Sequence, residues 1–419
     1  MIARSFTATA VAALLTLVYP AEASADDGVR LIGEQLLPTG LEHAGTTVGG
    51  LSGIDRDPKT GSFVLLSDDR SAINPARFYT AEIEVSEAGL GPIRLTGQHS
   101  LRRADGSTYP SAAEWAARPC TESRAVCDRL APVDPEDIRI DPHGADVWWS
   151  QEGDRNPPRL LTDPSIRRGG GGGGGARAGR AGPAQKKTNN NPPPLPTHPS
   201  TGGAPPPGAA LGEVELPPNY HIDDNGKGPR ANQGIEGFTF SAGGSRIASI
   251  LEGPLAQDGP EATPEHGALV RLTVQDRQGR VRQQVAYPVE PMAGPGPGIN
   301  SVSAILTAGS EDPERYLVLE RGVSAAGVTI RLFEVDLRGA TDIANIDALT
   351  AGSGVQPARK KLVADLGTLG LTRLGIVEGM TWGPKLRSGE RTLILVADDN
   401  FGATPGADSP TQFSALAMR

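Results

Sequence analysis

The sequence has few of the residues that most often carry enzyme chemistry. Its 419 residues include 2 cysteines, 6 histidines and only 4% aromatic side chains. The histidines are scattered without a His-x-x-x-His spacing, and no P-loop or Gly-x-Gly-x-x-Gly pattern follows a strand-like run. The segment Gly50–Ile54 has isoleucine where a nucleophile elbow requires its last glycine. The sequence therefore predicts neither a zinc site of the His-x-x-x-His type, nor a nucleotide cradle, nor a serine nucleophile of that kind.

An excess of positive charge and long apolar runs are missing as well. The net charge is −9, whereas a nucleic-acid partner needs a basic face, so we expect no nucleic-acid binding. After residue 25 no apolar run approaches the roughly 18 residues of a membrane span. We therefore expect no integral membrane segment in the mature chain.

Residues 1–25 have the pattern of a signal peptide. Arg4 precedes an apolar run from Ala8 to Val18, and Ala23-Ser24-Ala25 has the small-x-small form of a cleavage site. A retained anchor helix is the alternative. We predict an exported protein, periplasmic or secreted. Export permits a disulfide bond between Cys120 and Cys127, which we interpret as a structural staple of a loop.

One segment is much richer in glycine and proline than the rest of the chain. Residues 164–211 contain seven consecutive glycines, a Pro-Pro-Pro run after three asparagines and a second Pro-Pro-Pro run. Such a composition cannot bury enough apolar surface to fold, so we predict a disordered insertion. A cluster of lysine and arginine there could tether the chain to an anionic surface, but we favour a solvated insertion within one domain formed by residues 26–163 and 212–419.

The remainder of the chain consists of short strand-like runs that repeat. In five places a run begins near a polar lead residue, turns, and ends at an acidic residue. The separations are 16, 16, 16, 17 and 20 residues for the pairs Ser52/Asp68, Glu136/Glu152, Glu236/Glu252, Ser303/Glu320 and Glu378/Asp398. No segment has a convincing helical period. The protein is predicted to be all-β and built from five similar units.

Four strands in most of these units indicate a β-propeller. The fifth unit has only three strands, and a lone strand-like run at Leu31–Leu37 is available to complete it. We predict five four-stranded blades, the last closed by this N-terminal strand, because closure removes an exposed sheet edge. Six blades is the alternative if residues 102–133 contain further strands.

Several of these segments resemble a known family. Gly50–Asp55 with Leu66–Arg70, Asn232–Gly237, and Glu378–Trp382 with Asp398–Phe401 look like the hallmarks of the phytase-like ("esterase-like activity of phytase") family of exported bacterial proteins. The resemblance covers the chain from about residue 49 to the end, less the insertion. It implies hydrolysis of esters or phosphoesters, by analogy with β-propeller phytases that use calcium. The characteristic acidic motifs of those calcium enzymes do not occur in this sequence.

The propeller geometry brings the lead and closing residues of all units to one mouth of the central channel. Many carboxylates so close together need cations or basic partners, and Ca²⁺ takes six to eight oxygen ligands of this kind. The predicted metal ligands are Asp68, Asp69, Glu136, Glu152, Glu252, Glu320 and Asp399. The predicted catalytic residues are Glu236, Glu378 and Asp398. The predicted substrate-binding residues are Arg70, Arg155, Arg321 and Asn400.

Two functions are consistent with this mouth. One is a calcium-assisted hydrolase, acting as a monomer on a small anionic ester. The other is an exported binding module without turnover. In the second case each acid would be a structural device that accepts backbone N–H groups and pairs with arginine to join neighbouring blades. A residue type that recurs in every blade favours the structural interpretation for any single acid.

Overall fold

The computed structural model describes residues 28–156, 160–162, 164–170, 209–223, 225–309, 312–350, 354–403 and 409–419. Side chains are described for these residues except 125, 154–156 and 160–162. The predicted signal peptide lies outside the described residues. Among the helices of the described residues, none is long and apolar enough to cross a membrane.

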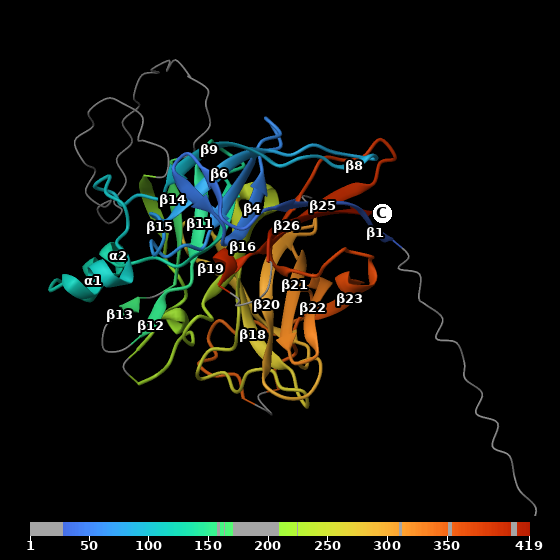
Figure 1. Cartoon of the computed structure of the whole chain (residues 1–419). Helices are drawn as coiled ribbons and strands as arrows, with labels where there is room; N and C mark the ends of the chain where they lie inside the picture. The colour runs from blue at the N-terminus through green and yellow to red at the C-terminus, as the bar shows by residue number, and fades with distance from the viewer. Residues whose placement is uncertain are drawn as a thin grey trace, which may run out of the picture.

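Five four-stranded antiparallel sheets form the blades of a β-propeller (Figure 1). Blade 1 contains β4 (Leu51–Arg56), β5 (Phe63–Ser67), β6 (Arg77–Glu82) and β9 (Arg94–Ser100). Blade 2 contains β10 (Pro135–Ile140), β11 (Val147–Gln151), β14 (Ser165–Gly169) and β15 (Ala210–Val214). Blade 3 contains β16 (Ile235–Ser241), β17 (Arg246–Leu251), β18 (Ala268–Asp276) and β19 (Val281–Val289). Blade 4 contains β20 (Gly298–Thr307), β21 (Arg315–Ser324), β22 (Gly327–Asp336) and β23 (Arg359–Asp365). Blade 5 contains β24 (Ile376–Trp382), β25 (Arg391–Asp398), β26 (Thr411–Met418) and β1 (Val29–Leu37).

The ring is closed by contacts between the innermost strands and by apolar side chains between the blades. The innermost strands contact one another in the order β4, β10, β16, β20, β24 and back to β4. One cluster of buried apolar residues lies between each pair of neighbouring blades, for example Ile250 of blade 3 with Val302 and Ile305 of blade 4. The core is therefore shared between blades, and each blade depends on its neighbours for burial of its faces.

Blade 5 is completed by the N-terminal strand, which confirms the predicted closure. β1 pairs antiparallel with β26, from Val29 opposite Met418 to Leu37 opposite Thr411. Figure 1 shows β1 beside the C-terminal end of the chain. Without β1 the apolar strand β26 would leave an unpaired edge, which is a hazard for aggregation.

The region 102–133 does not supply a sixth blade. Its described elements are α1 (Ala112–Ala117) and α2 (Arg124–Leu130), which lie at the periphery of the propeller (Figure 1). A disulfide bond joins Cys120 to Cys127 in the same region. The fold is thus the predicted five-bladed one.

Both ends of the predicted insertion differ from the expectation of disorder, because they form strands of blade 2. β14 and β15 pair with each other, with Ile166 opposite Val214 and Arg167 opposite Glu213. Ile166 is fully buried, and the guanidinium of Arg167 donates to the Tyr109 hydroxyl at 2.9 Å. The prediction of disorder is based on the composition of the whole segment, which does not reveal that the short runs at its two ends can pair as strands. Residues 171–208 lie outside the described residues.

The side chain of Arg139 blocks the central channel. It projects from β10 and donates hydrogen bonds to carbonyl oxygens on the innermost strands of the other four blades. The distances are 2.6 Å to Ile54, 2.8 Å to Phe238, 3.1 Å to Ile305 and 3.2 Å to Met380. Its charge is balanced by Asp137, whose carboxylate lies 2.9 Å away. The channel is therefore divided into two separate ends.

Candidate functional site at the acidic mouth

Each innermost strand carries a β-bulge near its first residue. The register shifts fall between residues 51 and 53, 135 and 138, 235 and 237, 302 and 304, and 377 and 379. The extra residues include all five lead residues of the sequence repeat: Ser52, Glu136, Glu236, Ser303 and Glu378. A bulge changes the direction of a side chain relative to the regular strand alternation. The sequence repeat therefore reflects a backbone bulge that recurs in all five blades.

The closing residue of each blade follows the residue that pairs just before the bulge. In blade 3 Ile235 pairs with Leu251, and Glu252 follows. In blade 4 Val302 pairs with Glu320, and Arg321 follows. Arg321 is therefore the counterpart of Glu252, and the alignment of Glu320 with the closing acids is off by one residue. Because side chains alternate along a strand, that single residue moves Glu320 to the opposite face of its sheet.

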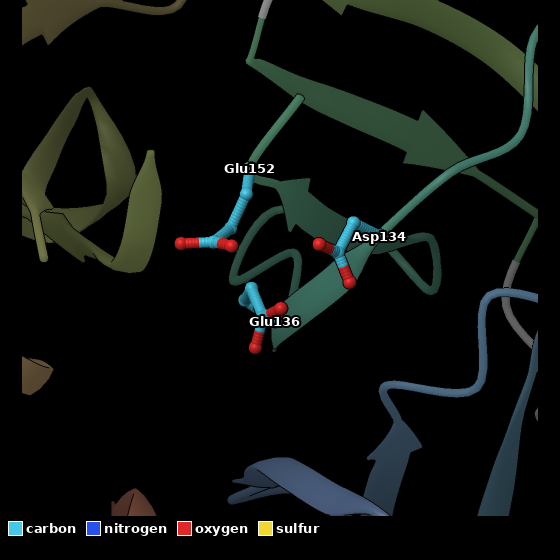
Figure 2. Close-up of side chains that lie close together, drawn as sticks. All are labelled: Asp134, Glu136 and Glu152. Atoms are coloured by element: carbon cyan, nitrogen blue, oxygen red, sulfur yellow. The ribbon is translucent and has the colours of Figure 1, made fainter. Parts of the chain in front are cut away.

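Seven carboxylates and one guanidinium collect at this end of the channel, and we call this set the acidic mouth. Its members are Asp68, Glu136, Glu152, Glu236, Glu252, Arg321, Glu378 and Asp398. Two triads within it place one carboxylate oxygen from each residue within 4.8 Å of the others: Glu152 with Glu236 and Glu252, and Glu152 with Glu136 and the adjacent Asp134. Figure 2 shows the side chains of Glu136, Glu152 and Asp134 directed toward one another. Glu152 is the residue that the two triads share.

Glu152 and Glu236 are buried, yet their carboxylates are only partly satisfied. Glu152 is 3% exposed; its Oε1 accepts the Gly234 N–H at 2.9 Å, and its Oε2 has no hydrogen-bond partner among the described residues. Glu236 is 6% exposed and accepts no hydrogen bond within the described part of the chain. Glycine is required at 234 because a Cβ there would lie 2.0 Å from the Glu152 carbonyl oxygen. A buried oxygen without a donor is costly unless a proton or a cation occupies it.

Burial and mutual repulsion raise the pKa of these carboxyl groups. For Glu136, Glu152 and Glu236, burial raises the pKa well above its usual range, and the neighbouring carboxylates add to the effect. Asp68 and Asp398 behave in the same way: burial again comes first, with a contribution from Asp398 to Asp68 and from Glu378 to Asp398. The mouth therefore cannot hold all of its negative charge at neutral pH without a counter-ion.

Arg321 supplies part of that counter-charge. Its guanidinium lies 2.7 Å from Glu252 and also forms an ion pair with Glu378, so that it links blades 3, 4 and 5. Burial raises the pKa of Glu252 and of Glu378, and Arg321 opposes this in both. Burial lowers the pKa of Arg321, but Glu378 and Glu252 more than compensate and keep it above its usual range. No such arginine partner is found at Glu136 and Glu236 among the described residues.

Three predicted metal ligands lie outside this cluster and have other hydrogen-bond or ion-pair partners. Asp69 accepts the N–H groups of residues 72–74 and pairs with Arg77 at 2.7 Å. Asp399 accepts the N–H of Gly50 at 2.9 Å through its Oδ1, which joins blade 5 to blade 1, while its buried Oδ2 has no hydrogen-bond partner among the described residues. Glu320 accepts the Tyr287 hydroxyl at 2.7 Å and pairs with Lys360. These contacts match the structural interpretation of the acids.

The remaining predicted residues are at the rim or outside the described part. Arg70 pairs with Asp134 at 2.7 Å, and its side chain is 46% exposed. Asn400 is exposed and donates its backbone N–H to Asp398 at 2.9 Å. The side chain of Arg155 lies outside the described residues. Asp134 was not predicted, although its position beside Pro135-Glu136 could have suggested it.

We expect the cation-free protein to lose stability as the pH rises from about 4, the pKa of an unfolded carboxyl group, to about 7, the raised pKa of Asp137. Burial raises the pKa of Asp137 to about 7, opposed by Arg139, and the acidic mouth adds further raised carboxyl groups. A carboxyl group with a raised pKa in the folded state binds a proton that the unfolded chain has already lost. Stability is therefore full below the unfolded pKa, about 4, and falls as the pH passes through the folded pKa. Calorimetry in chelator should show a falling melting temperature, whereas a rise over this interval would contradict the prediction.

Comparison with known proteins adds a family but no activity. A protein-family model described as "Phytase-like: Esterase-like activity of phytase" matches residues 46–401. The sequence has no significant match among curated proteins. Among solved structures, a PQQ-bound aldose sugar dehydrogenase from Streptomyces coelicolor is 11% identical with a TM-score of 0.37, covering 93% of this chain and 100% of that one. A gluconolactonase from Xanthomonas campestris is 10% identical with a TM-score of 0.30, covering 95% and 99%. Likeness at this level of identity says nothing of activity.

Proposed function

The chain belongs to the phytase-like family (esterase-like activity of phytase), and on that basis we propose a function for the acidic mouth. It is a hydrolase of phosphoesters or related anionic esters that works with a divalent cation, with Ca²⁺ as the first candidate. The observation that carries the proposal is Glu152, a buried carboxylate shared by two acidic triads, with one oxygen lacking any hydrogen-bond partner in the described chain.

The donor set fits a hard cation. Glu136, Glu152 and Glu236, with Asp134 and Glu252 beside them, offer carboxylate oxygens from two adjacent blades. Ca²⁺ takes six to eight oxygen ligands in flexible geometry, and carboxylates are preferred among them. When bound, such a cation polarises a phosphoryl or carbonyl oxygen and lowers the pKa of a coordinated water.

The other half of the mouth provides groups for proton transfer and orientation. Asp398 is buried, and burial together with Glu378 raises its pKa, so it can hold a proton for a leaving group. Arg321 keeps Glu252 and Glu378 in place through its two ion pairs. In this proposal Arg70 and Asn400 at the rim contact the oxygens of an anionic substrate. Arg139 closes the channel beneath, which limits access to one side.

A binding module without turnover is the second candidate. It is favoured by Arg321, because this predicted substrate-binding residue already pairs with two carboxylates of the mouth. A cation held there would join blades 2 and 3 as Arg321 joins blades 3 to 5. In that case the cation would stabilise the ring without taking part in a reaction.

Turnover of a panel of phosphomonoesters and carboxylic esters by the mature protein distinguishes the two. We expect hydrolysis that EDTA removes and added Ca²⁺ restores, together with a melting temperature that rises with Ca²⁺. Hydrolysis that is unchanged in EDTA would contradict the metal-assisted hydrolase. A melting temperature that rises with Ca²⁺ without any turnover would instead establish the binding module.

We also propose that the protein is exported, to the periplasm or the medium, and acts as a monomer. The disulfide bond between Cys120 and Cys127 supports an oxidising compartment. N-terminal sequencing of protein from the culture should find cleavage after residue 25. Retention of residues 1–25 would contradict this part of the proposal.

A further inference from the structure

The end of the channel opposite the acidic mouth holds a cavity of about 580 Å³, which we call the far cavity. It is lined by the turns that follow the innermost strands, so that all five blades contribute. Arg139 reaches it from the channel and separates it from the acidic mouth. Its volume falls within the roughly 300–1,000 Å³ that small-molecule sites usually occupy.

The far cavity has the opposite charge character to the acidic mouth. Four cations besides Arg139 line it, and none has a carboxylate partner among the described residues: Arg56, Lys59, Lys385 and Arg391. Lys59 and Arg391 reach only the carbonyl oxygens of Pro142 and Ala308. Arg56 and Lys385 make no ion pair or side-chain hydrogen bond within the described chain.

The acids that line the far cavity are already satisfied by their neighbours. Asp55 accepts the Ile140 N–H and the Thr381 hydroxyl, both at 2.8 Å. Asp57 caps its own turn through the N–H of Lys59. Asp141 forms an ion pair with Arg277. The positive charge of the cavity is thus left for a ligand.

Apolar and aromatic groups make up much of the remaining wall. Trp382 is held by a hydrogen bond from its Nε1 to the Thr307 carbonyl at 2.8 Å, and the Arg391 guanidinium lies 3.3 Å from its ring centroid. Phe240 lies edge-on to Trp148. The indole of Trp382, beside the unpaired cations Arg56 and Lys385, is suited to a ligand with a flat apolar body and a negative group.

We propose that the far cavity binds an aromatic carboxylate. The carboxylate pairs with Arg56 and Lys385, and the ring lies against Trp382. This site is separate from the acidic mouth, and it depends neither on a metal nor on hydrolysis.

Isothermal titration of the full chain with 2-naphthoate at low ionic strength tests the proposal. We expect saturable binding to one site, at least about tenfold weaker in the Arg56→Ala/Lys385→Ala double variant. The neutral analogue 2-naphthamide should bind at least tenfold more weakly than 2-naphthoate to the unaltered protein. The matched control Arg94→Ala/Lys361→Ala removes two exposed cations from the outer strands β9 and β23, and it should leave the affinity unchanged.

Calcium binding measured on the same variants separates this site from the acidic mouth. The Arg56→Ala/Lys385→Ala variant should keep the Ca²⁺ affinity of the unaltered protein, whereas Glu152→Gln should keep its affinity for 2-naphthoate. Absence of saturable binding overturns the proposal. Equal affinity for the amide, or loss of naphthoate binding in Glu152→Gln, overturns it as well.

Discussion

Replacing Arg139 with methionine is expected to lower the free energy of unfolding by roughly 3–5 kcal/mol. The guanidinium is 2% exposed and donates to four carbonyl oxygens from four blades. Methionine fills a similar volume but leaves these acceptors without a donor. It also removes the ion pair of the buried Asp137 carboxylate, which keeps only the N–H groups of Ile138 and Phe238 as donors among the described residues. Urea denaturation followed by circular dichroism measures the loss.

Two further variants show whether the loss comes from the channel position. Arg168→Met breaks an exposed ion pair with Asp146 on the same blade, and it should cost less than about 1 kcal/mol. Arg139→Met combined with Asp137→Asn removes both charges, so it should be more stable than Arg139→Met alone. If Arg139→Met were no more costly than Arg168→Met, Arg139 would not be the centre of the ring.

The double variant Glu152→Gln/Glu236→Gln is expected to weaken Ca²⁺ binding at least about 100-fold, equivalent to roughly 2.7 kcal/mol. It keeps the shape of both side chains but removes two charges from the triad that includes Glu252. Neutral amide oxygens are poorer ligands, and the mouth no longer needs a cation to balance it. Titration with Ca²⁺ and the calcium-dependent rise in melting temperature both report the change, and ester turnover should fall with them.

Glu265→Gln is the matched control, because this exposed carboxylate contacts only its own turn. It should bind Ca²⁺ as the unaltered protein does. In chelator, the double variant should also be more stable than the unaltered protein at pH 8, since two repelling charges are gone. Unchanged Ca²⁺ affinity in the double variant would show that Ca²⁺ does not bind at the acidic mouth.

The sequence predicts the blade count and most of the acidic mouth because the repeat reflects a recurring backbone feature. Every blade requires a bulge at the same place, and Glu136, Glu236 and Glu378 occupy that position in three of them. Strand β1 was predicted because three strands leave an open edge in blade 5. The bulge is a local feature of the sequence, and the role of β1 follows from counting the strands of each unit.

The errors concern features that depend on register and on distant partners. Glu320 and Arg321 are adjacent, and only the pairing of Val302 with Glu320 shows which of them faces the channel. Arg139 lies between two isoleucines, but its four acceptors lie up to 241 residues away. Every residue has a main-chain carbonyl oxygen, so the sequence does not show which of them accept from Arg139. Its contacts with the other four blades could therefore not be predicted from a single sequence.

The pairing of β1 with β26 has a consequence for how the protein reaches its folded state. β1 precedes and β26 follows all the other strands of the blades, so blade 5 can be completed only after β26 has been synthesised. Contacts of such long sequence separation form slowly, and until then unpaired strand edges are available to other chains. Closure of the ring is therefore one of the last steps of folding.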